Sequence, residues 1–396
     1  MRNARLEDRT AWVLLLVLFA LVAIGLPELG SDPWPFRPGA VDPQGVLAPL
    51  VRAAGEEWDV GIARAAAFAA ALVLGAAALM LYGRRRAWPG WAGAALVLVV
   101  GVLLAGPSTF LQLGLRQSTA PWFHTNDSTY QIELAGDLLL HGHNPYGHDY
   151  RGSGLERFYT RDGSVSQRVL EREVALRHYA YFPGTVITAA AWRLLPAPLD
   201  DLRLLILLST LGGLGAALAF RAPLHWRLAV GALLVCNPIA VRSSWFGQND
   251  APSLLLMLLA FALVTRRRFG LAAAALAGAI LLKQFALVAA PFIALMLVHA
   301  GATRAELKRA AAVFAGVLAV VILPFFAADP GGFYDDTVKY GAGTYKIVGY
   351  GLSAILIRLG VLADRSGSYP FALIALLTWL PLTVWLLYVQ RRAGEL

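Results

Sequence analysis

The sequence predicts an all-α, polytopic membrane protein, and three observations support this fold class. Hydrophobic residues make up 58% of the 396 residues and charged residues only 15%, whereas soluble domains carry about 25% charge. Apolar runs long enough to cross a bilayer recur along the chain. The basic residues gather in short clusters between these runs, as in cytoplasmic loops. The net charge of +9 therefore does not indicate nucleic-acid binding.

The first apolar run, residues 11–26, follows Arg2, Arg5 and Arg9. Basic residues tend to stay in the cytoplasm, so this run is expected to lead outward. A cleaved signal peptide is the alternative, but no small-residue cleavage site follows the run, which favours a retained helix. Cys236 is the only cysteine, so no intrachain disulfide is expected.

Simple alternation of spans fails at residues 182–195. If this run crossed the membrane, the cluster Arg266, Arg267 and Arg268 would lie outside, against the charge rule. The run is short, contains Arg193 and is flanked by prolines, which suits a helix lying at the interface. All of residues 114–201 are therefore expected outside.

The remaining apolar runs give about ten spans, with both termini in the cytoplasm. The predicted spans are residues 11–26, 62–82, 91–113, 202–220, 228–241, 251–265, 269–282, 285–299, 310–327 and 370–389. Three parts follow. Residues 1–90 form an N-terminal pair of spans with an external linker. Residues 91–330 form the central transmembrane module, with the large external loop 114–201. Residues 331–396 form an external loop, an interfacial helix over residues 352–362 and the last span.

The most informative segment runs from His124 to Tyr150, directly after a predicted span. Asp127 precedes a run rich in Ala and Leu, so it suits an N-cap whose carboxylate accepts from backbone N–H groups. The other interpretation is a general base that deprotonates an acceptor hydroxyl. Asn144 and Tyr146 are candidate substrate-binding residues, although Pro145 equally indicates a turn that ends the helix.

Two further polar motifs are expected on the same external side. Gln248, Asn249 and Asp250 open a predicted span, where they can hold sugar hydroxyls or a metal, or only cap a helix. Lys283 interrupts a long apolar stretch, where a charge is costly. It suits an ammonium that neutralises a lipid phosphate, and the alternative is a lysine that snorkels to the interface.

A Gly-rich external loop contributes the last candidates. Tyr345 and Lys346 lie in it, between Tyr340 and Tyr350. Aromatic residues here can anchor the loop at the membrane interface or form a lid over a sugar. We therefore count Tyr345 and Lys346 among the candidate substrate-binding residues.

The order of these motifs resembles the GT-C superfamily of glycosyltransferases. The resemblance rests on an external Asp after a span, an amphipathic helix, then Gly-His-Asn-Pro-Tyr and Tyr-Phe-Pro. Gly-Gln-Asn-Asp at a span start and Leu-Leu-Lys-Gln between two short spans extend it. It covers roughly residue 91 to the C-terminus and is closest to bacterial polyprenyl-phosphate-mannose-dependent mannosyltransferases.

The resemblance implies an inverting transfer of a sugar, mannose above all, from a polyprenyl-phosphate donor to a lipid or glycan acceptor. It implies that Asp127 is the catalytic base, that Asp250 is the second acid and that Lys283 lies near the donor phosphate. The expected location is the cell membrane, with the active site on its external face. No cofactor is predicted, and a divalent metal is left open. The alternative is a transporter or flippase of a lipid-linked sugar, which would place its polar residues near the bilayer midplane.

Overall fold

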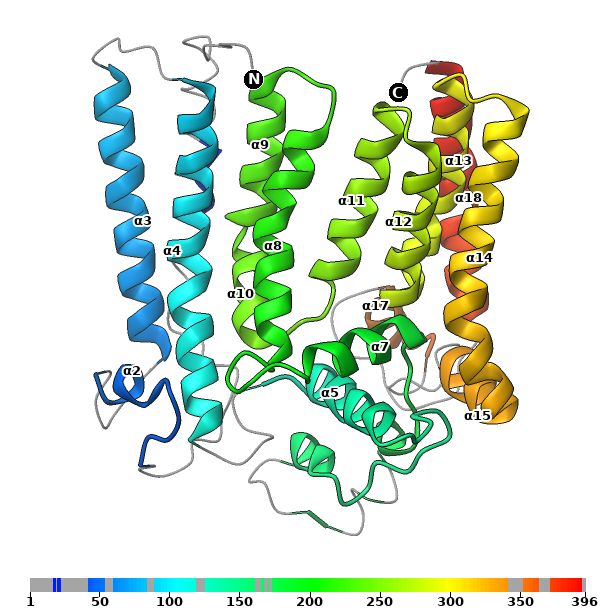
Figure 1. Cartoon of the computed structure of the whole chain (residues 1–396), viewed down its shortest axis with the longest axis horizontal. Helices are drawn as coiled ribbons and strands as arrows, with labels where there is room; N and C mark the ends of the chain where they lie inside the picture. The colour runs from blue at the N-terminus through cyan, green and yellow to red at the C-terminus, as the bar shows by residue number, and fades with distance from the viewer. Residues whose placement is uncertain are drawn as a thin grey trace.

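The computed structural model describes residues 17–18, 20–22, 42–53, 60–83, 89–118, 125–160, 165–166, 170, 173–340, 352–362 and 371–393. This part of the chain is helical and contains no β-strand. Long helices stand side by side above a layer of short helices and loops at one end (Figure 1). Most of the predicted first span lies outside the described residues, as do His124, Tyr345, Lys346 and Tyr350.

The helices of the bundle correspond to the nine predicted apolar runs after the first, with two helices dividing the run 228–241. They are α3 (Val60–Gly83), α4 (Gly90–Gln117), α8 (Leu202–Ala219), α9 (Leu224–Val235), α10 (Pro238–Phe246), α11 (Ala251–Thr265), α12 (Phe269–Leu282), α13 (Ala290–His299), α14 (Arg304–Ala328) and α18 (Phe371–Ala393). The end layer contains α2 (Ala48–Ala53), α5 (Asp127–Leu140), α7 (Pro183–Trp192) and α15 (Pro330–Tyr334). The remaining elements are α17 (Leu352–Arg358) and the short helical turns η2 (Leu155–Tyr159), η3 (Val174–Arg177), η4 (Gln284–Ala289) and η5 (Asp335–Tyr340).

Within the described residues, three helices are long and apolar enough to cross a membrane: α4, α8 and α14. The pair α9 and α10 is a fourth candidate if it is counted as one bent span. The two helices differ in direction by 44° because Asn237 starts a new helix, its side chain accepting from Ile239 N, and Pro238 lacks the N–H needed for continuity. The other predicted spans are shorter apolar helices or do not pass the same test.

The predicted interfacial helix of residues 182–195 and the predicted amphipathic helix before it lie together in the end layer as α7 and α5 (Figure 1). Their backbones approach closely at Gly136, where an added Cβ would lie 2.8 Å from Ala189 Cβ. α7 has ten residues and lies in the end layer rather than among the helices of the bundle (Figure 1). Residues 182–195 therefore do not form a crossing helix.

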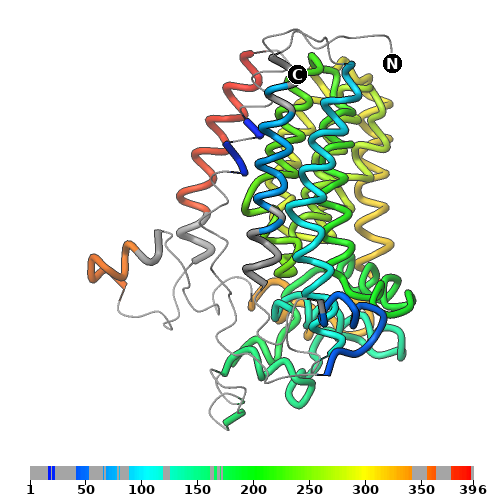
Figure 2. Tube along the Cα trace, turned by 90° about the vertical axis from the view of Figure 1, so that its left-hand side faces the viewer, coloured from blue at the N-terminus to red at the C-terminus, as the bar shows by residue number. Residues whose placement is uncertain are grey.

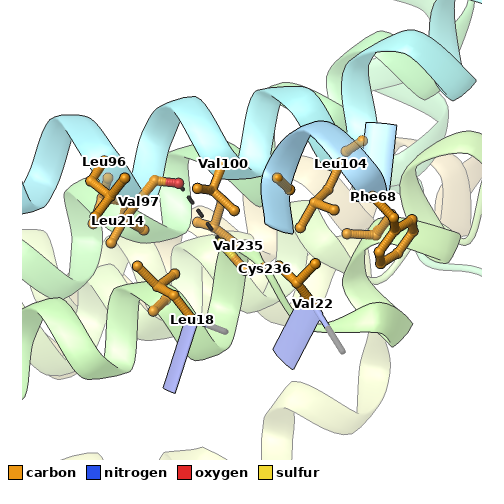
Figure 3. Packing of buried hydrophobic residues seen from close by; sticks show 14 of the residues in the cluster. Leu18, Val22, Phe68, Leu96, Val97, Val100, Leu104, Leu214, Val235 and Cys236 are labelled. Carbon is orange, nitrogen blue, oxygen red and sulfur yellow. Dashed lines mark hydrogen bonds between the residues drawn. The ribbon is translucent and has the colours of Figure 1, made fainter. Parts of the chain in front are cut away.

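Three hydrophobic clusters hold these elements together. The first joins α3, α4, α8, α9 and α10, and Figure 3 shows Val97 and Val100 of α4 beside Cys236. The Cys236 thiol lies 3.8 Å from the Val97 carbonyl oxygen and is buried. The second cluster joins α11 to α14 through η4, and the third lies in the end layer around α5 and α7.

α18 stands at the edge of the bundle, and Figure 2 shows it beside the other long helices rather than among them. It is anchored to α13, where Gln390 Nε2 donates to the Phe292 carbonyl at 3.2 Å. Most of its described apolar side chains are exposed, including Leu377 and Trp385. Such a surface is expected of a helix that faces lipid.

Candidate functional site

Asp127 is the first residue of α5, but the cap of this helix is its neighbour. The Asn126 side chain accepts from Ser128 N at 2.8 Å and so takes the N-cap position that the sequence assigned to Asp127. One carboxylate oxygen of Asp127 also lies 2.8 Å from Ser128 N. The second oxygen points away from this first turn and is reached by Tyr159, whose hydroxyl lies 3.4 Å from it.

Burial of the Asp127 carboxyl raises its pKa above the ordinary value of 3.8. The hydrogen bonds from Ser128 N and the Tyr159 hydroxyl oppose this effect without cancelling it. A carboxylate that is partly desolvated is a stronger base than one in water. The Asp127 carboxylate is therefore a stronger base than an exposed one.

The polar turn between α10 and α11 meets the first turn of α5. Gly247 ends α10 with φ +89°, a conformation that suits glycine. Its carbonyl accepts a hydrogen bond from the Thr129 hydroxyl. This contact brings residues 247–250 next to the helix that carries Asp127. The Gln248 side chain is engaged locally, since its Oε1 accepts from the Ser243 hydroxyl at 2.7 Å.

Lys283 lies at the break between α12 and η4, where the backbone is extended. Its Nζ donates to Asn249 Oδ1 at 2.6 Å and lies 3.0 Å from Asp250 Oδ1. The rings of Tyr181 and Phe285 lie 5.0 and 5.6 Å from the same nitrogen. With 14% of its side chain exposed, Lys283 reaches across to the start of α11 rather than out to solvent.

Two apolar cavities flank this polar group. One of about 470 Å³ lies against α8, α9, α10 and α11, and one of about 350 Å³ lies between α11 and the η4–α13 segment. Asp250, Leu254 and Phe285 line both. An apolar chain in either cavity would thus end beside Asp250 and Lys283.

A network of buried charges fixes α5 against the long helices. Arg116, at the end of α4, contacts Glu133 of α5 at 2.5 Å and Asp201 at 2.8 Å. Asp201 caps α8 and is also paired with the fully buried Arg203 at 2.7 Å. Burial alone would raise the pKa of Asp201, but Arg203 and Arg116 hold it below its ordinary value. The network is four charged side chains from three helices.

Tyr146 lies in the core of the end layer, and Asn144 lies partly exposed in the turn before it. Tyr146 is 2% exposed, its hydroxyl donates to the Tyr181 carbonyl at 2.8 Å, and its ring packs on Phe333. Asn144 Oδ1 accepts from Tyr146 N at 3.2 Å, as expected for the predicted Pro145 turn. In this structure the Tyr146 side chain is closed to a ligand. Its contacts are those of a packing residue.

The buried acid Asp336 was not singled out by the sequence either. Asp336, 1% exposed, accepts from Gly147 N at 2.9 Å and lies 2.7 Å from His178 Nδ1. The His178 ring stacks on Tyr340 with centroids 4.8 Å apart. Burial raises the pKa of Asp336. The cluster fastens η5 to the loop that follows α5.

Sequence reasoning also missed Tyr159, Asn249 as the hydrogen-bond partner of Lys283, and the charge network. Tyr181 could have been identified from the sequence, because it belongs to the Tyr-Phe-Pro motif. The other contacts join residues far apart in the chain. No local sequence pattern predicts these contacts.

Among the described residues, no group of three or more His, Cys, Asp or Glu side chains is arranged to hold a metal ion. Comparisons with known proteins gave no match: no family model, curated protein or solved structure is significantly similar to the chain.

Proposed function

We propose that the protein is a membrane glycosyltransferase that moves a sugar, mannose above all, from a polyprenyl-phosphate donor to a lipid or glycan acceptor hydroxyl. The observation that carries the proposal is the grouping of Lys283, Asn249 and Asp250 between two apolar cavities, next to the helix that begins at Asp127. This reaction needs three features: an ammonium for the phosphate, an apolar cavity for the lipid chain and a carboxylate base.

Asn249 adds a second reason to expect a ligand. Its Oδ1 accepts from Lys283, while its buried Nδ2 has no hydrogen-bond partner in the described part of the chain. A buried amide N–H left without an acceptor costs about 1–3 kcal/mol. A phosphate or sugar oxygen would relieve that cost.

The proposed chemistry requires one base. Asp127 takes the proton from the acceptor hydroxyl while that oxygen bonds to the anomeric carbon of the sugar. The bond from this carbon to the phosphate oxygen breaks, and its electron pair stays on the phosphate beside Lys283. Attack from the face opposite the phosphate inverts the anomeric configuration. Because phosphate already leaves as an anion, no protonating acid is needed.

The proposed setting is the cell membrane, with about ten spans, both termini in the cytoplasm and the end layer outside. The basic clusters support this orientation. The turn Arg266–Arg268, the first turn of α14 and the last turn of α18 all lie at the end of the bundle opposite α5 (Figure 1). The flippase alternative expects polar groups near the middle of the long helices, whereas Asp127, Asp250 and Lys283 gather at one end.

Lys283→Met tests the proposal, because methionine keeps an apolar stem without the charge. Donor affinity for polyprenyl-phosphate mannose should fall about 10- to 100-fold, which corresponds to about 1.5–3 kcal/mol for a hydrogen bond to a charged group. Lys308→Met, at an exposed lysine near the opposite end of the bundle, is the matched control.

The readout is transfer of radiolabelled mannose by purified protein in bilayers to a lipid and glycan fraction, with the anomeric configuration of the product determined. Labelled product with inverted configuration supports the transferase. Movement of the intact donor across the bilayer, with no transferred sugar, would refute the transferase and support the flippase.

A further inference from the structure

The Asp250 carboxylate makes no hydrogen bond to its own helix. Asp250 occupies the N-cap position of α11, but its backbone is already helical (φ −84°, ψ −30°) and its side chain caps nothing. Asp201, at the same position of α8, accepts from Arg203 N at 2.9 Å. Helix capping therefore does not explain an acid at residue 250.

What Asp250 does contact is the Lys283 ammonium. Their closest atoms are 3.0 Å apart, yet the contact lacks hydrogen-bond geometry, whereas Asn249 forms a directed bond to the same nitrogen. The Asp250 side chain is 43% exposed and that of Lys283 only 14%. Lys283 is therefore held by a directed bond to Asn249, and its contact with Asp250 is the one that lacks hydrogen-bond geometry.

The position of Asp250 coincides with the place where a lipid head group would arrive. On α11, Ala251, Leu255 and Leu258 face the larger cavity, while Ser253, Met257 and Phe261 face the smaller one. Asp250 borders both. A lipid whose chain fills either cavity brings its phosphate to the ammonium that Asp250 already neutralises.

We propose that Asp250 is a displaceable counter-ion that the donor phosphate must exchange for itself at Lys283. This inference rests on the proposed function and assigns Asp250 to selectivity and release instead of to catalysis. The donor is a phosphodiester with one negative charge, so the exchange keeps the largely buried ammonium neutralised by one anion throughout. A neutral lipid cannot make the exchange, because it would leave the ammonium without a counter-charge.

Asp250 also acts after transfer. The product, a phosphate monoester, carries about 1.5–2 negative charges at pH 7. It would bind an isolated ammonium more tightly than the donor does, and its release would limit turnover. Return of the Asp250 carboxylate to Lys283 competes with the product and speeds its departure.

Asp250→Asn removes the competing charge and keeps the side-chain shape. Binding of polyprenyl-phosphate mannose to the purified full chain should tighten about tenfold, and binding of polyprenyl phosphate should tighten more, since each tenfold step is about 1.4 kcal/mol. Binding of the neutral polyprenol should not change. In steady state, KM and kcat should both fall, with a burst of product in the first turnover.

Asp335→Asn is the control, because Asp335 forms an exposed pair with Lys339 at 3.3 Å. Thermal unfolding of both variants shows whether the fold is retained. If Asp250→Asn is unstable, Asp250→Ser, tested in the same way, replaces it. Unchanged or weaker donor affinity in the folded variant overturns the proposal, as does equal tightening for polyprenol. A wild-type protein that neither binds nor uses the donor would instead refute the proposed function.

Discussion

Asp127 and Asp250 both stand at the start of a helix, where an acid ordinarily serves as a cap. In α5 that position belongs to Asn126, and in α11 the Asp250 side chain caps nothing. Asp127 accepts from Ser128 N in its own first turn, and each carboxylate also has a partner from a distant segment, Tyr159 for Asp127 and Lys283 for Asp250. Position in a helix is therefore a poor guide to the role of an acid until its actual hydrogen bonds are known.

Tyr159→Phe tests the environment of the proposed base. The Tyr159 hydroxyl lowers the pKa of Asp127, while burial raises it above 3.8. A base must be deprotonated to act, so activity should be lost as the pH falls through the pKa of Asp127. Removing the hydroxyl should move this acidic limb of kcat/KM to higher pH. Tyr334→Phe, at an exposed tyrosine, is the control and should leave the pH profile unchanged. If the acidic limb does not move in Tyr159→Phe, the Tyr159 hydroxyl does not influence the pKa of Asp127.

At the scale of the element, α5 is the helix whose placement decides the site. It is held by the Arg116–Glu133 pair, by the Thr129 contact to Gly247 and by close packing on α7 at Gly136. Glu133 also accepts from Leu202 N at 3.1 Å, which ties α5 to the start of α8. Together these contacts fix the position of α5 relative to the long helices.

Glu133→Gln breaks the charge network on one side. Arg116 keeps Asp201 as a partner, but the network loses one of its two negative charges while Arg203 stays buried. Breaking a buried ion pair costs about 3–5 kcal/mol, so thermal unfolding in detergent should occur at a clearly lower temperature. Asp149→Asn removes an exposed pair with Arg151 and should change little, because such pairs contribute about 0–1 kcal/mol. Equal stability of the two variants would contradict a structural role for the network.

At the scale of the whole molecule, the sequence predicts which segments are helical better than it predicts how they meet. Apolar runs and basic clusters indicate the long helices, and the shortness of residues 182–195 indicates that α7 does not cross. The bend at Asn237 and Pro238 divides a predicted span, although Asn-Pro is a known turn signal. The contacts of Tyr159, Asp336 and Glu133 depend on tertiary packing across long sequence separations. Periodicity carries no information about them.

Thiol labelling tests the proposed orientation. His143→Cys lies in the end layer and Arg268→Cys at the opposite end of the long helices, and both positions are exposed. The native Cys236 is buried, so its background labelling should be low. A membrane-impermeant reagent added to intact cells should label residue 143 and reach residue 268 only after permeabilisation. Labelling of both in intact cells would contradict a bundle that spans the membrane with its end layer outside.

The most direct test of the account is sugar transfer by Asp127→Asn. The change keeps the side-chain shape and removes its basicity. Transfer from polyprenyl-phosphate mannose should fall by about 10²-fold or more, the usual contribution of a general base, with donor affinity unchanged. The raised pKa of Asp127 means that its ionised form is disfavoured in the folded state. That penalty is absent well below pH 3.8 and complete above the raised pKa, so the variant should be at least as stable as wild type at neutral pH. Transfer at the wild-type rate by the folded Asp127→Asn protein would show that Asp127 is not the base.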